Sequence, residues 1–369
     1  MNAGEIGVRQ RGFNLVELMV ALSLGLFVAL GISMMFVGAS RSERELMKTA
    51  QQIENGRYAV DILSKDLWHA GFYGYLLDRP APPAVEPDPC VVNDTAAMYS
   101  ALANPVQVFW APDWASVADV SVTTCAIPSP MPGSDVLVIR RANTQEMLPT
   151  DATTAGDVYI QTVSGGGEIQ IGNGALLGTG NRANGTPASS PPPLLKTDGS
   201  AALIYKYHVR VYFVSRCSNA TGAGAVCQPS DDGGKWIPTL KRLELSSNGG
   251  ATAMRLVSIA EGIDALRVDL GVDNTPANLN PLTTSVGDGM PDAFLRMSVN
   301  RITDFSNAVA ANVWVLARNN QATPNYTDAK VYDFGPLSGT KAAANDAFAR
   351  HLFSGQVQIA NAALRRQIP

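Results

Sequence analysis

The feature that most constrains the fold is a long apolar run near the N-terminus, "FNLVELMVALSLGLFVALGISMMFV", at residues 13–37. As an α-helix this run would be about 37 Å long, which exceeds the hydrocarbon core of a bilayer at about 30 Å. Glu17 is its only ionisable residue. The run therefore predicts a helix that crosses a membrane once.

The flanking charges predict the orientation of this helix. Arg9 and Arg11 precede the run, whereas basic and acidic residues alternate after it, at residues 41–48. A basic start favours a cytoplasmic N-terminus. A cleaved secretory signal has a shorter apolar region, of about 7–15 residues, with its cleavage site after that region. Here a cut fits best at the Gly12–Phe13 junction, which would leave the anchor in the mature protein.

Glu17 is not explained by a plain membrane anchor. A carboxylate near the end of a transmembrane helix costs about 2.5 kcal/mol or more on insertion scales, and such a group usually has a partner. The nearest candidate cation is the α-amine that a cut before Phe13 would create, one helical turn from Glu17. In an assembly, Glu17 could instead neutralise the amine of a neighbouring subunit. We therefore predict that Glu17 is a docking group.

The stretch "RGFNLVELMVALSLG" resembles the signal of type IV pilins and type II secretion pseudopilins. In that superfamily a prepilin peptidase cuts after the glycine and methylates the new N-terminal phenylalanine. The resemblance implies cleavage and methylation at Gly12 and Phe13 and an assembly role for Glu17. It also implies an α+β, type IV pilin-like fold, with a long N-terminal helix packed on a large antiparallel β-sheet head with long loops.

The helix is predicted to continue beyond the membrane. The chain has no proline from Gly12 to Arg79, and apolar residues recur every seven positions, at Leu46, Ile53, Val60 and Leu67, with Leu63 beside them. This spacing predicts a helix over residues 13–70 whose second half packs on a sheet. Gly71, Gly74 and Pro80 are expected to end it. We predict a leader at 1–12, a membrane half at 13–37, an amphipathic half at 38–71 and a head domain at 72–369.

The rest of the chain has the pattern of strands and loops. "YKYHVRVYFV", from Tyr205, alternates so that apolar side chains face a core while Lys206, His208 and Arg210 face solvent. Residues 164–200, rich in Gly, Asn and Pro, predict a long loop or an inserted hairpin. Further strands are predicted at "VQVFWA" (106–111), "DVLVIRRA" (135–142), "DVYIQTV" (157–163), "RLEL" (242–245), "ALRVDLGV" (265–272), "NVWVLAR" (312–318) and "GQVQIANAA" (355–363).

Four cysteines form two sequence-local pairs, Cys90 with Cys125 and Cys217 with Cys227. An even number of cysteines in an exported chain favours disulfides and an oxidising compartment. Four cysteines allow three connectivities, of which we favour the sequence-local one. Closing the shorter loop would stabilise the fold by roughly 2–3 kcal/mol in the chain-entropy model.

The residues that could carry chemistry are few. The histidines are His69, His208 and His351, and the sequence has no G-x-S-x-G, H-E-x-x-H or P-loop motif, so we predict neither an enzyme nor an organic cofactor. A net charge of −4 without a basic stripe argues against nucleic acid as the main partner.

One acidic constellation suits Ca²⁺, because hard oxygen ligands are the ones that this ion prefers. It comprises Asp273, Asn274, Asp288 and Asp292. The spacing is not that of an EF-hand loop, and Asp and Gly in such a stretch also build tight turns. Both interpretations stay open at this point.

Segments within residues 203–360, among them "HVRVYFVSRC", "LVSIAEGIDALRVDLGVDN" and "NVWVLARNN", resemble the PilW-type minor pilins. The resemblance implies a single-pass inner-membrane protein with a periplasmic head that later enters the pilus tip. Its implied partners are other minor pilins, the major pilin, the prepilin peptidase and a tip adhesin, and its role is to prime pilus assembly for twitching and adhesion. The alternatives are a minor pseudopilin of a type II secretion system and a membrane-anchored calcium- or ligand-binding protein.

Overall fold

The first element of the computed structural model is α1 (Leu15–His69), a single helix of 55 residues. The helix ends before Gly71, whose φ of 75° lies in the left-handed region that terminates helices. The structure describes residues 12, 14–77, 79–109, 125, 127–148, 151–174, 194–274, 287–296 and 305–367.

The chain divides into two compact units, residues 1–50 and residues 51–369. The second is called the head unit below, and it includes the last part of α1. A helix that continues well beyond the apolar run is therefore confirmed. The predicted divisions at residues 12, 37 and 71 stay predictions.

The larger sheet of the head unit has seven antiparallel strands in the order β1-β2-β5-β3-β4, with β6 joining β5 to β7. The long strand β5 pairs with β2 along one edge, while β3 and β6 share its other edge. The bounds are β1 (Val106–Phe109), β2 (Val136–Met147), β3 (Val158–Val163), β4 (Gly166–Ile171), β5 (Ile204–Ser215), β6 (Thr239–Asn248) and β7 (Ala251–Glu261).

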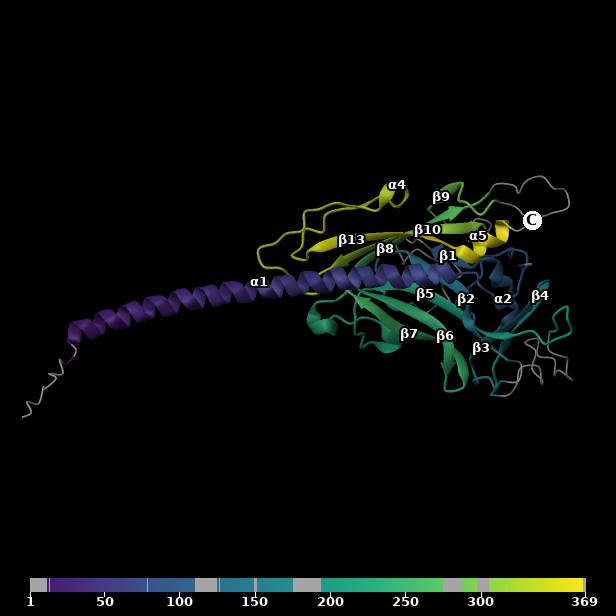
Figure 1. Cartoon of the computed structure of the whole chain (residues 1–369), viewed down its shortest axis with the longest axis horizontal. Helices are drawn as coiled ribbons and strands as arrows, with labels where there is room; N and C mark the ends of the chain where they lie inside the picture. The colour runs from purple at the N-terminus through teal and green to yellow at the C-terminus, as the bar shows by residue number, and fades with distance from the viewer. Residues whose placement is uncertain are drawn as a thin grey trace, which may run out of the picture. The chain divides into compact units, whose positions relative to one another are not determined.

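A second antiparallel sheet has the order β13-β10-β8-β9, and β11 and β12 form a separate ribbon. Figure 1 shows the part of α1 in the head unit running between these two main sheets. The remaining strands are β8 (Ile263–Val272), β9 (Ala293–Leu295), β10 (Ala308–Arg318), β11 (Tyr332–Asp333), β12 (Thr340–Lys341) and β13 (Arg350–Gln358), and the short helices are α2 (Thr95–Ser100), α4 (Gly335–Ser338) and α5 (Ala360–Gln367). This arrangement confirms the predicted α+β class.

The main core lies around α1. Ala59, Leu63 and Leu67 are fully buried there, among apolar side chains of both main sheets. Small residues on the helix allow close packing, since a Cβ added to Gly56 would lie 2.3 Å from a ring atom of Phe353 on β13. The helix is thus the central layer of the head unit rather than a cover on one side.

The predicted apolar stripe of α1 is only partly correct. Leu63 and Leu67 are buried, but Leu46 is 69% exposed and Ile53 is 36% exposed. A pattern that counts only large apolar side chains misses the true buried face, because close helix–sheet packing selects small and hydrogen-bonding residues. The buried positions of α1 are Gln52, Gly56, Ala59, Leu63, Asp66 and Leu67.

The prediction that one face of β5 is wet is wrong. His208 on that face is 9% exposed, and Tyr212 is fully buried. This face lies against α1, and its charged groups pair with acids: Arg210 with Asp66 and Glu244, and the partly exposed Lys206 with Asp157. The opposite face carries a second core, in which Tyr207 and Val211 pack with Tyr73 and other side chains.

All eight predicted strands occur, with shifted ends. The strand predicted at 355–363 stops at Gln358, and α5 follows, so its second half is wrong. β4, β7, β9, β11 and β12 were not predicted. Because β4 pairs with β3, the predicted loop or hairpin at 164–200 begins as a hairpin, while residues 175–193 lie outside the described residues.

Both cysteine pairs are disulfide-bonded, Cys90 to Cys125 and Cys217 to Cys227. This is the sequence-local connectivity. The second bond closes a loop with a sequence separation of 10 residues directly after β5. The loop is further held by Asp231, whose carboxylate accepts hydrogen bonds from the Thr221 hydroxyl at 2.6 Å and from the Gln228 amide at 2.6 Å.

We predict that Gly56→Ala destabilises the chain. Overpacking a close contact costs about 1–3 kcal/mol, which exceeds or offsets the gain of about 1 kcal/mol in helix propensity. Gly38 lies on the same helix, and a Cβ added there would meet nothing within 4 Å, so Gly38→Ala is the matched control. Thermal unfolding of the full chain in detergent should show a lower midpoint for G56A than for G38A, and equal midpoints would contradict the close packing.

Candidate functional site

Glu17 lies in the first turn of α1. Its carboxylate is favourably placed there, because the unsatisfied N–H groups at a helix N-terminus carry partial positive charge. Gly12 is exposed, and Phe13 lies outside the described residues. Glu17 is therefore close in sequence to the predicted cleavage junction and free to meet a cation from outside the chain's own fold.

The apolar run provides the surroundings of Glu17. Every residue of 14–39 is exposed, and no part of the most apolar 18-residue window, with a mean hydropathy of 2.4, is buried. By length and composition α1 could cross a membrane. An apolar surface of this extent requires a cover of lipid or protein.

Asp66 joins α1 to the larger sheet. It is 4% exposed, and its Oδ2 lies 2.8 Å from Arg210 Nη1 of β5. Arg141 of β2 lies 3.2 Å away, and the Tyr212 hydroxyl donates a further hydrogen bond. Burial alone would raise the pKa of Asp66, but its hydrogen bonds and ion pairs with these groups, Arg210 above all, hold the pKa below its usual value.

The polar network around Asp66 extends across the larger sheet to β6. Arg242 Nη2 lies 2.6 Å from Glu244 Oε2, and Arg242 Nη1 donates to the Tyr212 hydroxyl at 3.1 Å. His208 lies beside Glu244, where burial, followed by the charges of the nearby arginines, lowers its pKa to about 4. His208 is therefore neutral at physiological pH. Asp66 contacts both Arg141 of β2 and Arg210 of β5, and a rotation of α1 about its axis would break these contacts. The network therefore fixes the rotation of α1 against β5.

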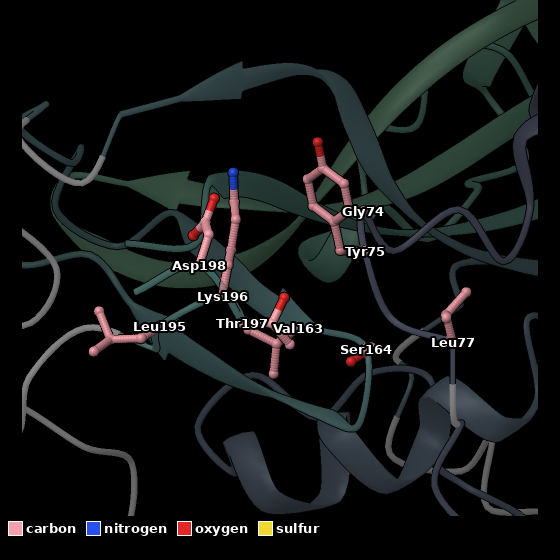
Figure 2. A pocket seen from close by; sticks show the side chains of 9 residues that line it. All are labelled: Gly74, Tyr75, Leu77, Val163, Ser164, Leu195, Lys196, Thr197 and Asp198. Atoms are coloured by element: carbon pink, nitrogen blue, oxygen red, sulfur yellow. The ribbon is translucent and has the colours of Figure 1, made fainter. Parts of the chain in front are cut away.

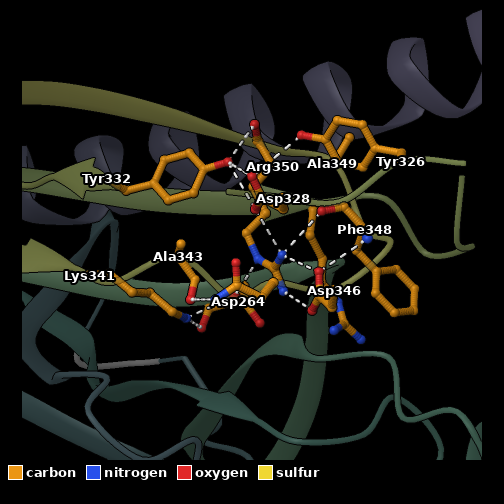
Figure 3. A network of polar contacts seen from close by, with 12 residues as sticks. Asp264, Tyr326, Asp328, Tyr332, Lys341, Ala343, Asp346, Phe348, Ala349 and Arg350 are labelled. Carbon is orange, nitrogen blue, oxygen red and sulfur yellow. Dashed lines mark hydrogen bonds and ion pairs between the residues drawn. The ribbon is translucent and has the colours of Figure 1, made fainter. Parts of the chain in front are cut away.

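A second buried network ties the segment between β10 and β13 to the smaller sheet (Figure 3). Arg350 donates to three carboxylates, with distances of 2.9 Å to Asp264, 2.9 Å to Asp328 and 2.7 Å to Asp346. The Tyr332 hydroxyl adds a hydrogen bond to Asp328 at 3.0 Å. This arrangement matches one guanidinium to an acid of β8 and to two acids of the segment between β10 and β13, which is a structural role.

The four residues of the calcium prediction lie where two segments meet. The Asp273 carboxylate is fully buried and accepts a hydrogen bond from Arg366 at 3.0 Å. The Asp292 carboxylate accepts one from the Asn274 amide at 2.7 Å, and Asp288 accepts one from the amide two residues on, at 2.8 Å. The Asp288 contact is typical of a turn, whereas Asp273 forms an ion pair with α5 and Asp292 links two segments 18 positions apart. Calcium binding by the four residues stays a prediction.

Other groups of side chains that could bind a metal ion are scarce in the described part of the chain. The one group of three His, Cys, Asp or Glu side chains with ligand atoms within 4.8 Å of one another is Asp88 with Cys90 and Cys125. These two cysteines are joined in a disulfide, so they offer no thiolate to a metal.

The remaining histidines also have structural surroundings. His69 Nδ1 lies 2.7 Å from the Lys65 carbonyl oxygen at the end of α1, as expected for a histidine in a last helical turn. His351 packs edge-on against Phe353, with ring centroids 4.7 Å apart. Neither arrangement presents a base to a nucleophile.

A cavity of about 500 Å³ opens beside the segment that follows α1 (Figure 2). Tyr75, Leu77 and Leu195 line it together with polar side chains, and Lys196 Nζ lies 5.2 Å from the centroid of the Tyr75 ring. This cavity has no signal in the sequence, because its lining comes from three segments that only the fold brings together.

Residues 211–361 match the family model described as PilW, type IV Pilus-assembly protein W. This match supports a PilW-family assignment. The PilW match extends from within β5 into α5, so it includes the network around Arg350 but begins just after Arg210 and leaves out Asp66. The family implies a role in type IV pilus assembly and fits a structural protein. No curated protein and no solved structure matches the chain.

We predict that Asp66→Asn destabilises the head unit by about 3 kcal/mol, since it removes the buried partner of a close ion pair, leaving Arg141 without its acid and Arg210 with only the more distant Glu244. Asp61 is the matched control, because it lies on the same helix in an exposed ion pair with Lys65. Asp61→Asn should cost about 0.5 kcal/mol or less. Denaturant unfolding of both variants measures the difference, and similar values would show that the Asp66 pair contributes little.

We also predict that stability falls with acidification because of His208. An unfolded histidine binds its proton near pH 6.5, whereas the buried His208 does so only near pH 4. The unfolded state therefore binds more protons in this window, and stability that is fully present above pH 6.5 is lost as the pH falls toward 4. The melting temperature should drop less over this window in His208→Gln. The exposed His351→Gln should retain the full drop, and equal drops in both variants would argue against this origin.

Proposed function

We propose that the chain is a minor pilin that enters the type IV pilus as a structural subunit and helps prime its assembly. The proposal includes cleavage and N-methylation at the Gly12–Phe13 junction, anchoring in the inner membrane by the apolar part of α1, and a periplasmic head. Its partners would be other minor pilins, the major pilin and the prepilin peptidase, with a tip adhesin beside them.

One observation carries the proposal: Glu17 stands in the first turn of an exposed apolar helix, directly after the predicted junction. In a low-dielectric environment an unpaired carboxylate is costly, and an opposite charge within hydrogen-bond distance removes much of that cost. The α-amine of a processed neighbour would supply this charge in an assembly. A subunit would thus be held in place by a pair that exists only after cleavage.

Two other features support a pilin-like role. Two disulfides suit an oxidising compartment such as the periplasm. The Asp66 network fixes the last turns of α1 within the head unit, as a pilin-like head would require. Both features support export and assembly rather than a freely soluble enzyme.

A minor pseudopilin of a type II secretion system is the alternative, because it would share the anchor and its processing. The match of residues 211–361 to the PilW family favours the pilus. A deletion strain separates the two: loss of surface pili and twitching supports the proposal, whereas loss of enzyme secretion with normal pili supports the alternative.

The decisive test replaces Glu17 with Ala in the producing cell. The mature chain should still begin at Phe13 with one added methyl group, as read by mass spectrometry, because the variant retains the junction. Its recovery in sheared pili should fall about tenfold or more, which corresponds to about 1.4 kcal/mol. Glu43, an exposed acid beyond the apolar run, is the matched control. Recovery of E17A equal to that of E43A would refute the docking role, and a mature chain that begins at Met1 would refute the processing.

A further inference from the structure

Three arginines gather around Tyr73, the second residue after the left-handed turn at Gly71. Tyr73 is fully buried, and its hydroxyl has no hydrogen-bond partner among the described residues. The guanidinium of Arg365, on α5, lies 5.6 Å from the centroid of the Tyr73 ring. The charges of Arg140, Arg365 and Arg79 all act on the Tyr73 hydroxyl. The charged groups around the Tyr73 hydroxyl are therefore hydrogen-bond donors, and the described residues provide no acceptor for its O–H group.

The arginines of this cluster lack ion-pair partners within the described residues, where no carboxylate forms a salt bridge with Arg79, Arg140 or Arg365. Arg140 Nη1 donates to a backbone carbonyl oxygen at 3.0 Å, and Arg79 Nη1 reaches only another such oxygen, at 3.5 Å. Nη1 of Arg365 is buried without an acceptor. The negative charges of Asp88 and Glu86 partly balance the positive charge of Arg140 from a distance. No carboxylate among the described residues acts in this way on Arg79 or Arg365.

Several other arginines of the head unit differ from the cluster. Arg366, next in the chain, lies 3.0 Å from Asp273, and the half-buried Arg210 and the buried Arg350 each contact carboxylates. Unpaired charges are costly even where they are only partly buried, and proteins retain them mainly where they have a use. Burial and the repulsion of Arg365 together lower the pKa of Arg79 to about 10, so the group stays charged at neutral pH.

We infer that Tyr73, Arg79 and Arg365 form a binding site for a single oxyanion, a carboxylate or phosphate group. Such a group would accept the O–H of Tyr73 and N–H groups of both arginines in charge-assisted hydrogen bonds. Arg140, fully buried nearby, adds positive potential without needing to move. Arg79 and Arg365 are half-buried, so the anion can approach them from solvent.

The test uses the full chain in neutral-detergent micelles. Inorganic phosphate and, in a second arm, glutamate are titrated at constant ionic strength by calorimetry, which separates the phosphate source from the carboxylate source. Binding should saturate in at least one arm. Arg365→Gln and Arg79→Gln should each weaken it about tenfold or more, and Tyr73→Phe should weaken it several-fold, since a charge-assisted hydrogen bond is lost in each. Arg255→Gln, at an exposed position on β7, should bind like the unaltered chain.

Two outcomes of the titration would overturn the inference. One is the lack of saturable binding by the unaltered chain. The other is equal binding by R365Q, R79Q and R255Q. Thermal unfolding of R365Q and R79Q without added anion is an independent measurement. If each arginine is an unpaired charge kept for binding, its removal should leave the unfolding midpoint unchanged or higher. A much lower midpoint for both R365Q and R79Q would show a purely structural role.

Discussion

The head unit depends on the burial of one carboxylate, that of Asp66, between two arginines of the larger sheet. The last turns of α1 are the middle layer of the fold, so both sheets are positioned by that helix. Apolar contacts of Ala59, Leu63 and Leu67 supply most of the stabilisation, but they are non-directional. The ion pairs with Arg210 and Arg141 are directional, and they select one rotation of the helix.

The N-terminal helix and most strands could be predicted from the sequence, because their signals are local. The apolar run, the lack of proline before Arg79 and the alternation in β5 each concern neighbours along the chain. The motif around Glu17 is local as well. For the same reason the PilW resemblance could be recognised from contiguous segments, and the family match covers much of the same region.

The rest depends on contacts between distant segments. The alternation in β5 indicates which residues share a face, but not that α1 covers the face with His208 and Arg210. Gly56 has no periodic signal, although its closeness to Phe353 sets how near the helix approaches β13. The Tyr73 cluster likewise combines residues up to 292 positions apart, counting from Tyr73 to Arg365. No local pattern predicts such a meeting.

The placement of α1 in the core has a mechanical consequence. The same helix carries the apolar run and the buried face of the head unit, without an intervening loop. A tensile load along the helix axis would therefore act on the core directly and strain its side-chain contacts in shear, so that many must yield together. The acid–arginine pairs at Asp66 would resist sliding most strongly, because a shift by one residue separates opposite charges in a water-poor interior.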